Sequence, residues 1–217
     1  MTTTGGDVRS ARNDERPCIV FEVTDHPARK YLETLREGGV VVDYVVMRND
    51  TEENGLPAHR ETADFAMCCI SGRQEEYIRR TMHKHPHLRH EQFTQYHWDV
   101  ALAAAAPYPV EKFLARPDDP YYIDKPKVTT SRAIDPEDGK YAYAFLEPPY
   151  GNKFVVKDWE RLNSLLFSSP SNLEIYKWTD NWSNYFNDGK EWWGTFFWTV
   201  YDRGRGYFVA VAASSTD

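Results

Sequence analysis

The segment from Trp193 to Tyr201 constrains the fold most strongly, because it carries aromatic side chains on both faces of an expected strand. Successive side chains of a strand point to opposite faces of the sheet. Phe197 therefore shares one face with Trp193 and Tyr201, and Phe196 shares the other with Trp198. A strand that is half exposed to water alternates with polar residues instead. We therefore expect both faces of this strand to be covered, by the chain's own helices or by a partner.

Other patterns in the C-terminal region predict elements around this strand. Residues 207–213 follow a glycine-containing turn at 202–206, which predicts a hairpin with the aromatic strand. Residues 173–178 and 141–146 alternate in the manner of strands. A helix is predicted around Trp159, because this residue shares one apolar face with Leu162, Leu165 and Leu166.

The N-terminal region predicts three strands and three helices. Apolar runs at 18–23, 40–46 and 64–70 predict buried strands. An apolar stripe predicts a helix between the first two runs, ending at Gly38. Ser71 and Gln74 form a capping-box pattern for a helix through Met82, and another helix is predicted over 89–106. The order of these elements is similar to the split βαβ order of ferredoxin-like folds.

These elements predict an α+β fold, with a mixed, mostly antiparallel sheet and helices packed on it. Residues 1–16 predict a flexible tail, and 107–136 form a proline-rich connector. Between and after them lie an α+β half at 17–106 and an aromatic-rich α+β half at 137–217. We expect the two halves to form one compact domain.

Composition limits the class of protein. The chain has 217 residues, of which 41% are hydrophobic and 27% charged, as in globular proteins. Neither a secretory signal nor an apolar run of about 18 residues is present, so a cytoplasmic protein without a membrane partner is expected. The formal net charge is −7, which argues against general nucleic-acid binding and favours a basic partner.

A histidine-rich segment at 83–97 contains five of the seven histidines of the chain. Imidazole is a common ligand of transition metals, which makes His85, His87 and His90 the candidate metal ligands. Their spacing matches no established metal-binding motif. We therefore expect a solvated polar turn, with no metal and no cofactor.

A polar-aromatic loop precedes the final hairpin. Its aromatic and acidic residues are interleaved, as in the rim of a pocket or in an interface. We expect this loop to contact a partner through Asp180, Trp182, Tyr185, Asp188, Glu191 and Trp192.

Two functions are compatible with these patterns. The favoured one is a cytoplasmic non-enzymatic protein-binding module, such as an acidic immunity-like or anti-defence protein that neutralises its partner. This analogy depends on size, acidity and aromatic content alone. The alternative is a small metal-assisted hydrolase or nucleic-acid-processing enzyme, with a site between the histidine segment and the loop at Asp180–Glu191. Its catalytic candidates are His90, His97, Asp188 and Glu191. Whether the chain is an enzyme, and its oligomeric state, stay open.

Overall fold

The computed structural model describes residues 20–49, 55–117, 140–191 and 193–215. At its centre is a six-stranded sheet in which all neighbouring strands are antiparallel, in the order β1-β2-β6-β5-β4-β3. Because β2 pairs with β6, strands from both halves of the chain belong to one sheet. The strands are β1 (Val20–Glu22), β2 (Asp43–Asn49), β3 (Ala105–Pro107), β4 (Leu173–Trp178), β5 (Thr195–Asp202) and β6 (Tyr207–Ser214).

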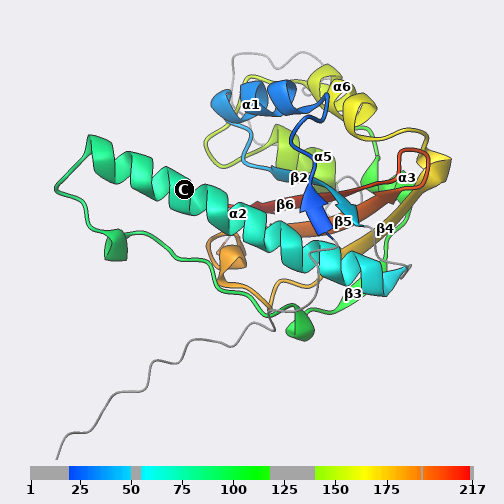
Figure 1. Cartoon of the computed structure of the whole chain (residues 1–217). Coiled ribbons are helices and arrows are strands. Elements are labelled where there is room, and N and C mark those ends of the chain that lie inside the picture. The colour runs from blue at the N-terminus through cyan, green and yellow to red at the C-terminus, as the bar shows by residue number, and fades with distance from the viewer. Residues whose placement is uncertain (1–19, 50–54, 118–139, 192, 216–217) are drawn as a thin grey trace, which may run out of the picture.

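Helices cover both faces of the sheet (Figure 1). On one face lie α1 (Arg29–Glu37), α3 (Val110–Phe113), α5 (Lys140–Leu146) and α6 (Val156–Leu166). The long helix α2 (Leu56–Lys84) crosses the other face. The predicted α+β fold is confirmed, and so are the helix at α1 and the strand at β4. Within the described residues, no helix is long and apolar enough to cross a membrane.

The central strand β5 is buried on both faces, as its aromatic pattern predicts. Phe196 and Trp198 pack in the core shared with α1, α5 and α6, whereas Phe197 packs in the core shared with α2. Phe197 meets the ring of Trp182 edge to face at 5.2 Å between centroids. The chain's own helices therefore cover this strand.

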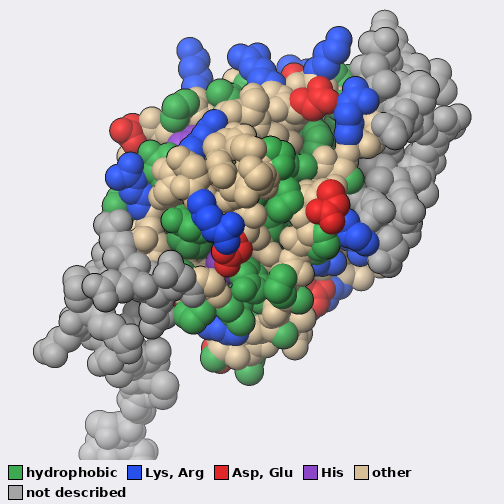
Figure 2. All heavy atoms as spheres, turned by 90° about the vertical axis from the view of Figure 1, so that its right-hand side faces the viewer, with side chains coloured by type: hydrophobic (Ala, Val, Ile, Leu, Met, Phe, Trp, Pro, Cys, Tyr) green, Lys and Arg blue, Asp and Glu red, His purple; other side chains and the backbone are tan. Residues whose placement is uncertain are grey.

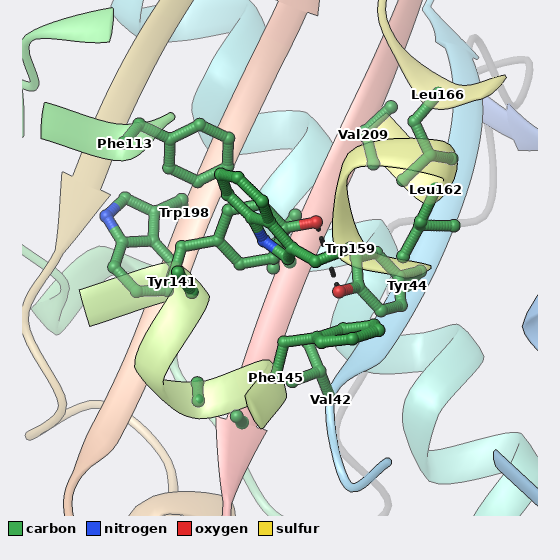
Figure 3. Close-up of a cluster of buried hydrophobic side chains, with 14 of the residues drawn as sticks. Val42, Tyr44, Phe113, Tyr141, Phe145, Trp159, Leu162, Leu166, Trp198 and Val209 are labelled. Atoms are coloured by element: carbon green, nitrogen blue, oxygen red, sulfur yellow. Dashed lines mark hydrogen bonds between the residues drawn. The ribbon is translucent and has the colours of Figure 1, made fainter. Parts of the chain in front are cut away.

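The core under α5 and α6 contains closely packed aromatic rings (Figure 3). Phe113 stacks on Tyr141 at 4.6 Å between centroids and meets Trp198 edge-on at 5.6 Å. The hydroxyl of Tyr44 donates to the hydroxyl of Tyr141 at 3.1 Å, and Tyr141 donates to Asn163 Oδ1 at 2.9 Å. This relay gives each buried phenol a partner and joins β2 to α5 and α6.

The predicted C-terminal hairpin is confirmed, and a buried carboxylate shapes its turn. Asp202 Oδ1 accepts hydrogen bonds from the backbone N–H groups of Gly204 and Arg205 at 2.9 and 3.2 Å. Its other oxygen accepts from the N–H of Ser168 at 2.6 Å. With a further hydrogen bond from the Ser168 hydroxyl, the Asp202 carboxylate accepts four hydrogen bonds. These replace the hydrogen bonds to water that this fully buried side chain loses.

The predicted strand at 64–70 is wrong, because these residues lie within α2. Ala63, Ala66, Met67 and Ile70 are buried at helical spacing on the side of α2 that faces the sheet. An apolar run of this length fits a buried strand or a buried helix equally well, and only the contact with the sheet decides. The capping-box pattern beginning at Ser71 accordingly lies inside the helix rather than at its start.

The predicted helix at 89–106 is also wrong. This segment is extended except for two single-turn 3-10 helices, His90–Gln92 and Val100–Leu102, and it ends in β3. Trp98 forms an isolated bridge with Ser183, and the N–H of Asp99 donates to the carbonyl of Trp182 at 2.8 Å. Pro107 and Pro109 favour extended backbone in the residues before them. These tertiary hydrogen bonds outweigh the helix propensity of the alanine run.

Two further predictions differ from the structure. Residues 141–146, predicted as a strand, belong to α5, in which Tyr141, Ala144 and Phe145 share a buried helical face. The ferredoxin-like order is absent from the described sheet, because β1 and β2 are adjacent and antiparallel. The tail at 1–16 lies outside the described residues, as does most of the connector at 107–136.

Candidate functional site

The polar-aromatic loop contributes its rings to the core rather than to the surface. Trp182 and Tyr185 are 2% and 5% exposed and pack beneath α2. Asp180 accepts a hydrogen bond from the Thr195 hydroxyl at 2.6 Å. Asp188 and Glu191 are exposed, and Trp192 lies outside the described residues. The rings of Trp182 and Tyr185 are therefore not available on the surface, and among the described candidates only Asp188 and Glu191 are exposed.

The histidine segment separates into two parts. His83, His85, His87 and His90 lie at the end of α2 and in the turn that follows, all exposed. His90 Nε2 lies 3.2 Å from Glu75 Oε2 of α2. His97 instead borders the loop, because its N–H donates to Asn184 Oδ1 at 2.7 Å and its carbonyl accepts from the N–H of Asn184 at 3.2 Å. Among the described residues, no group of three or more His, Cys, Asp or Glu side chains could hold a metal ion.

A cleft of about 270 Å³ opens at the β1 side of the sheet, between α1 and α2. Its apolar part consists of Leu32, Val23, Val46 and the ring of Tyr44. Its rim contains three arginines and three glutamates. They come from β1 (Glu22), α1 (Arg29, Glu33 and Arg36) and α2 (Arg73 and Glu76).

The cleft lies where, among the described residues, the edge of β2 lacks a neighbouring strand. β1 pairs only with Met47–Asn49, and one further bond joins the N–H of Val23 to the carbonyl of Val46 at 2.8 Å. Beyond this point, the carbonyl of Tyr44 accepts a hydrogen bond from Arg73 Nη1 at 2.9 Å. A side chain from α2 therefore occupies part of the position that a longer β1 would fill.

The guanidinium groups of the cleft are all paired with oxygen. Arg73 Nη2 lies 2.5 Å from Glu22 Oε1, and Arg29 Nη1 donates to the carbonyl of Thr24 at 2.6 Å. Arg36 lies 3.7 Å from Asp43 Oδ1, behind the cleft. The rim is thus balanced in charge, and each cation has an acceptor nearby.

Asp43 connects this cleft to the polar-aromatic loop. The hydroxyl of Tyr185 donates to Asp43 Oδ2 at 3.2 Å. Burial raises the pKa of the Asp43 carboxyl, and the nearby guanidinium groups of Arg73 and Arg36 oppose the rise. Burial also raises the pKa of Tyr185 well above its usual value, so that the phenol remains a donor. A predicted contact residue thus has a different role, as an internal support for the cleft.

Two buried histidines lie outside the predicted segment. His26, at the start of α1, accepts a hydrogen bond from the N–H of Ala28 through Nδ1 at 3.2 Å, and burial lowers its pKa. His59 Nδ1 of α2 lies 2.7 Å from the hydroxyl oxygen of Thr199, and burial lowers the pKa of His59 to about 4. The Thr199 oxygen also accepts from Trp178 Nε1 at 2.9 Å. The contacts of His59 lie inside the core, away from the cleft, whereas His26 is one of the residues that line the cleft.

No sequence motif indicates the cleft, because its residues are contributed by separate elements. Arg29, Glu33 and Arg36 are three or four residues apart on the polar side of α1, which resembles any solvated helix face. Arg73 lies in a region whose secondary structure the sequence pattern predicted incorrectly. No protein-family model, no curated protein and no solved structure matches this chain.

Proposed function

We propose that this chain is a non-enzymatic protein-binding module that holds an extended segment of its partner in the cleft between α1 and α2. The observation that carries the proposal is the edge of β2 beside that cleft, where, on the side away from β6, no described strand pairs with residues 43–46. An exposed sheet edge is a template for a further strand, whose main chain supplies affinity while pockets for its side chains supply specificity. The cytoplasmic location expected from the sequence is part of this proposal.

The lining of the cleft supports a peptide rather than a small ion as the ligand. Leu32 and Val46 offer apolar contact, whereas an incoming N–H group would have to share the carbonyl of Tyr44 with Arg73 Nη1. Charges of both signs around the rim match a segment with alternating apolar and charged side chains. A single small anion would have to compete with the carboxylates that pair with the arginines.

The acidic charge of the rest of the surface is complementary to a basic partner. The net charge of −7 favours encounter with a basic protein, and exposed Asp188 and Glu191 can contribute to this attraction. An immunity-like role, in which the chain neutralises such a partner, is the finer form of the same proposal.

Site-directed photo-crosslinking tests the docking site. A photo-reactive residue at Glu33, on the cleft rim, is expected to capture one protein in the cells that produce the chain. A matched probe at exposed Lys157 of α6 is expected to capture none. The captured protein is then purified, and its affinity is measured against the double variant Arg29→Glu/Glu33→Arg. This variant keeps the charge of α1 but exchanges the two positions.

We expect the exchange to weaken binding about tenfold, equivalent to about 1.4 kcal/mol. Equal capture from the Glu33 and Lys157 probes, or an unchanged Kd for the exchange variant, would contradict docking in the cleft.

The alternative, a metal-assisted enzyme, has one observation in its favour, which is that His97 borders the loop through its contacts with Asn184. This proposal predicts stoichiometric metal in untagged protein, measured by elemental analysis. It also predicts loss of that metal in His97→Ala without loss of helical circular dichroism. Protein that retains no metal after purification in buffer containing zinc would exclude this form of the enzyme.

A further inference from the structure

The C-terminal part of α2, together with the turn after it, forms an arm that extends beyond the sheet (Figure 1). Here the arm is defined as residues 71–90. The buried side of α2 that packs on the sheet ends at Ile70. Beyond it only Ile78 is buried, and this residue belongs to neither of the two core clusters. At about 1.5 Å per residue, roughly 20 Å of helix follows Ile70, and the first part of it still contacts the sheet through Arg73, which donates to the carbonyl of Tyr44 and pairs with Glu22.

The arm has a concentration of basic residues that the rest of the acidic chain lacks. From Tyr77 to His90 the sequence contains no aspartate or glutamate. The same stretch contains four cationic residues, Arg79, Arg80, Lys84 and Arg89, and four histidines, His83, His85, His87 and His90. All eight are exposed. At the opposite end of the molecule, basic and acidic side chains lie interspersed instead (Figure 2).

Most of these cations are available to a ligand. Arg80 pairs with Glu76, and His90 pairs with Glu75, both toward the base of the arm. Within the described part of the chain, Arg79, Lys84 and Arg89 form no ion pair. Tyr77, one turn before Arg80, is 58% exposed, so its aromatic ring is available on the surface of the arm.

We propose that the arm binds single-stranded nucleic acid. Proteins that bind single strands without sequence preference combine unpaired cations for the phosphates with aromatic rings for the bases, and the arm supplies both. A protein interface needs a buried apolar centre as well. Tyr77 is the only large hydrophobic residue of the arm that is highly exposed, so the arm offers little such surface.

The acidity of the whole chain shapes the expected binding. The net charge of −7 repels a polyanion from the body of the protein, so contact is restricted to the arm and to a short stretch of nucleotides. With about three phosphates neutralised, the affinity for a single strand is expected to fall about tenfold between about 50 and about 150 mM salt.

Fluorescence anisotropy with a labelled oligothymidylate of about 12 nucleotides tests the proposal, since site sizes of about 4–16 nucleotides are usual for such proteins. The variant Arg79→Glu/Lys84→Glu is compared with Lys157→Glu/Lys190→Glu, which changes the net charge equally at two exposed positions outside the arm. We expect the arm variant to lose at least about tenfold in affinity and the control variant to lose much less.

Three further variants separate binding from folding and from bulk charge. Arg79→Gln/Lys84→Gln avoids placing carboxylates near the C-terminal end of α2, where the helix dipole disfavours them. It is expected to weaken binding with unchanged helical circular dichroism. Tyr77→Ala is expected to lose about tenfold, and Tyr77→Phe to retain affinity, if the ring stacks on a base.

Three outcomes would overturn the proposal. One is the absence of binding by the wild-type chain at about 50 mM salt, where phosphate contacts are strong. Another is equal loss in the arm and control variants, which would indicate attraction by bulk charge. The last is displacement of the oligonucleotide by polyglutamate of the same charge as effectively as by unlabelled oligothymidylate, which would identify the arm as a surface for acidic proteins.

Discussion

The two parts of α2 differ sharply although they belong to one continuous helix. The part from Leu56 to Ile70 places small and apolar side chains such as Ala63 and Met67 against the sheet. The part from Ser71 to Lys84 buries only Ile78 and carries charged side chains on its surface. Helix stability in proteins comes chiefly from packing rather than from propensity. The comparison therefore shows how a packed segment can hold an exposed continuation in place, which leaves the surface of the continuation free for binding.

The largest change in the free energy of unfolding is expected when a buried side chain in the packed part of α2 is truncated. Met67 is fully buried, so Met67→Ala should lower the free energy of unfolding by about 2–5 kcal/mol, through lost apolar contact and the cavity left behind. Met82→Ala in the arm serves as the matched control, with an expected loss below about 1 kcal/mol. Urea unfolding of both variants measures the difference. Equal losses would mean that the arm is packed as tightly as the first part of the helix.

A pH dependence of almost the same size is expected from His59 in the packed part. Its pKa in the folded chain is about 4, below the ordinary value of 6.5. Between these pH values the unfolded chain binds a proton that the folded chain does not, so the free energy of unfolding falls as pH is lowered. The loss approaches about 3 kcal/mol below about pH 4.

His59→Asn should remove this contribution to the pH dependence of the free energy of unfolding, which denaturant titrations at several pH values measure. The comparison of wild type with variant cancels the contribution of Asp43, whose raised pKa acts in the opposite sense. Parallel curves for the two proteins would show that the imidazole is not held neutral in the core.

A smaller effect is expected at the junction of the two parts. Gly72 lies inside α2, is exposed, and an added methyl group would meet no atom within 4 Å. Gly72→Ala should therefore raise the free energy of unfolding by about 0.5–1 kcal/mol, because alanine loses less backbone entropy in a helix. Hydrogen exchange resolves where the gain occurs. Protection gained in the arm alone would show that the arm opens separately from the packed part.

The smallest effect is expected from the ion pairs on the surface of the arm. Arg80 and Glu76 are one helical turn apart, and their side chains are 74% and 51% exposed. Arg80→Ala should change the free energy of unfolding by no more than about 0.5 kcal/mol, because solvent and salt screen such pairs. A loss above about 1 kcal/mol in thermal unfolding would indicate a packing role for Arg80 that its exposure does not suggest.

The sequence predicted some elements well and others wrongly, for identifiable reasons. Strand β4, helix α6 and the hairpin of β5 and β6 have alternation or stripe patterns that fit one structure only. The run at 64–70 fitted two structures, and the alanine-rich run at 101–106 favoured a helix locally. Of the candidate contact residues, Asp188 and Glu191 are exposed, whereas Trp182 and Tyr185 are buried.

By itself, the sequence determined that β5 must be covered on both faces and that basic residues are concentrated between residues 77 and 90, because residue order fixes both features locally. Only the tertiary structure decided that α2 is continuous, that the rings of Trp182 and Tyr185 face inward, and that a cleft opens beside β2. These features depend on contacts between residues far apart in the chain, such as Arg73 with the carbonyl of Tyr44. A local pattern does not specify such contacts, because the same residues satisfy it in more than one packing arrangement.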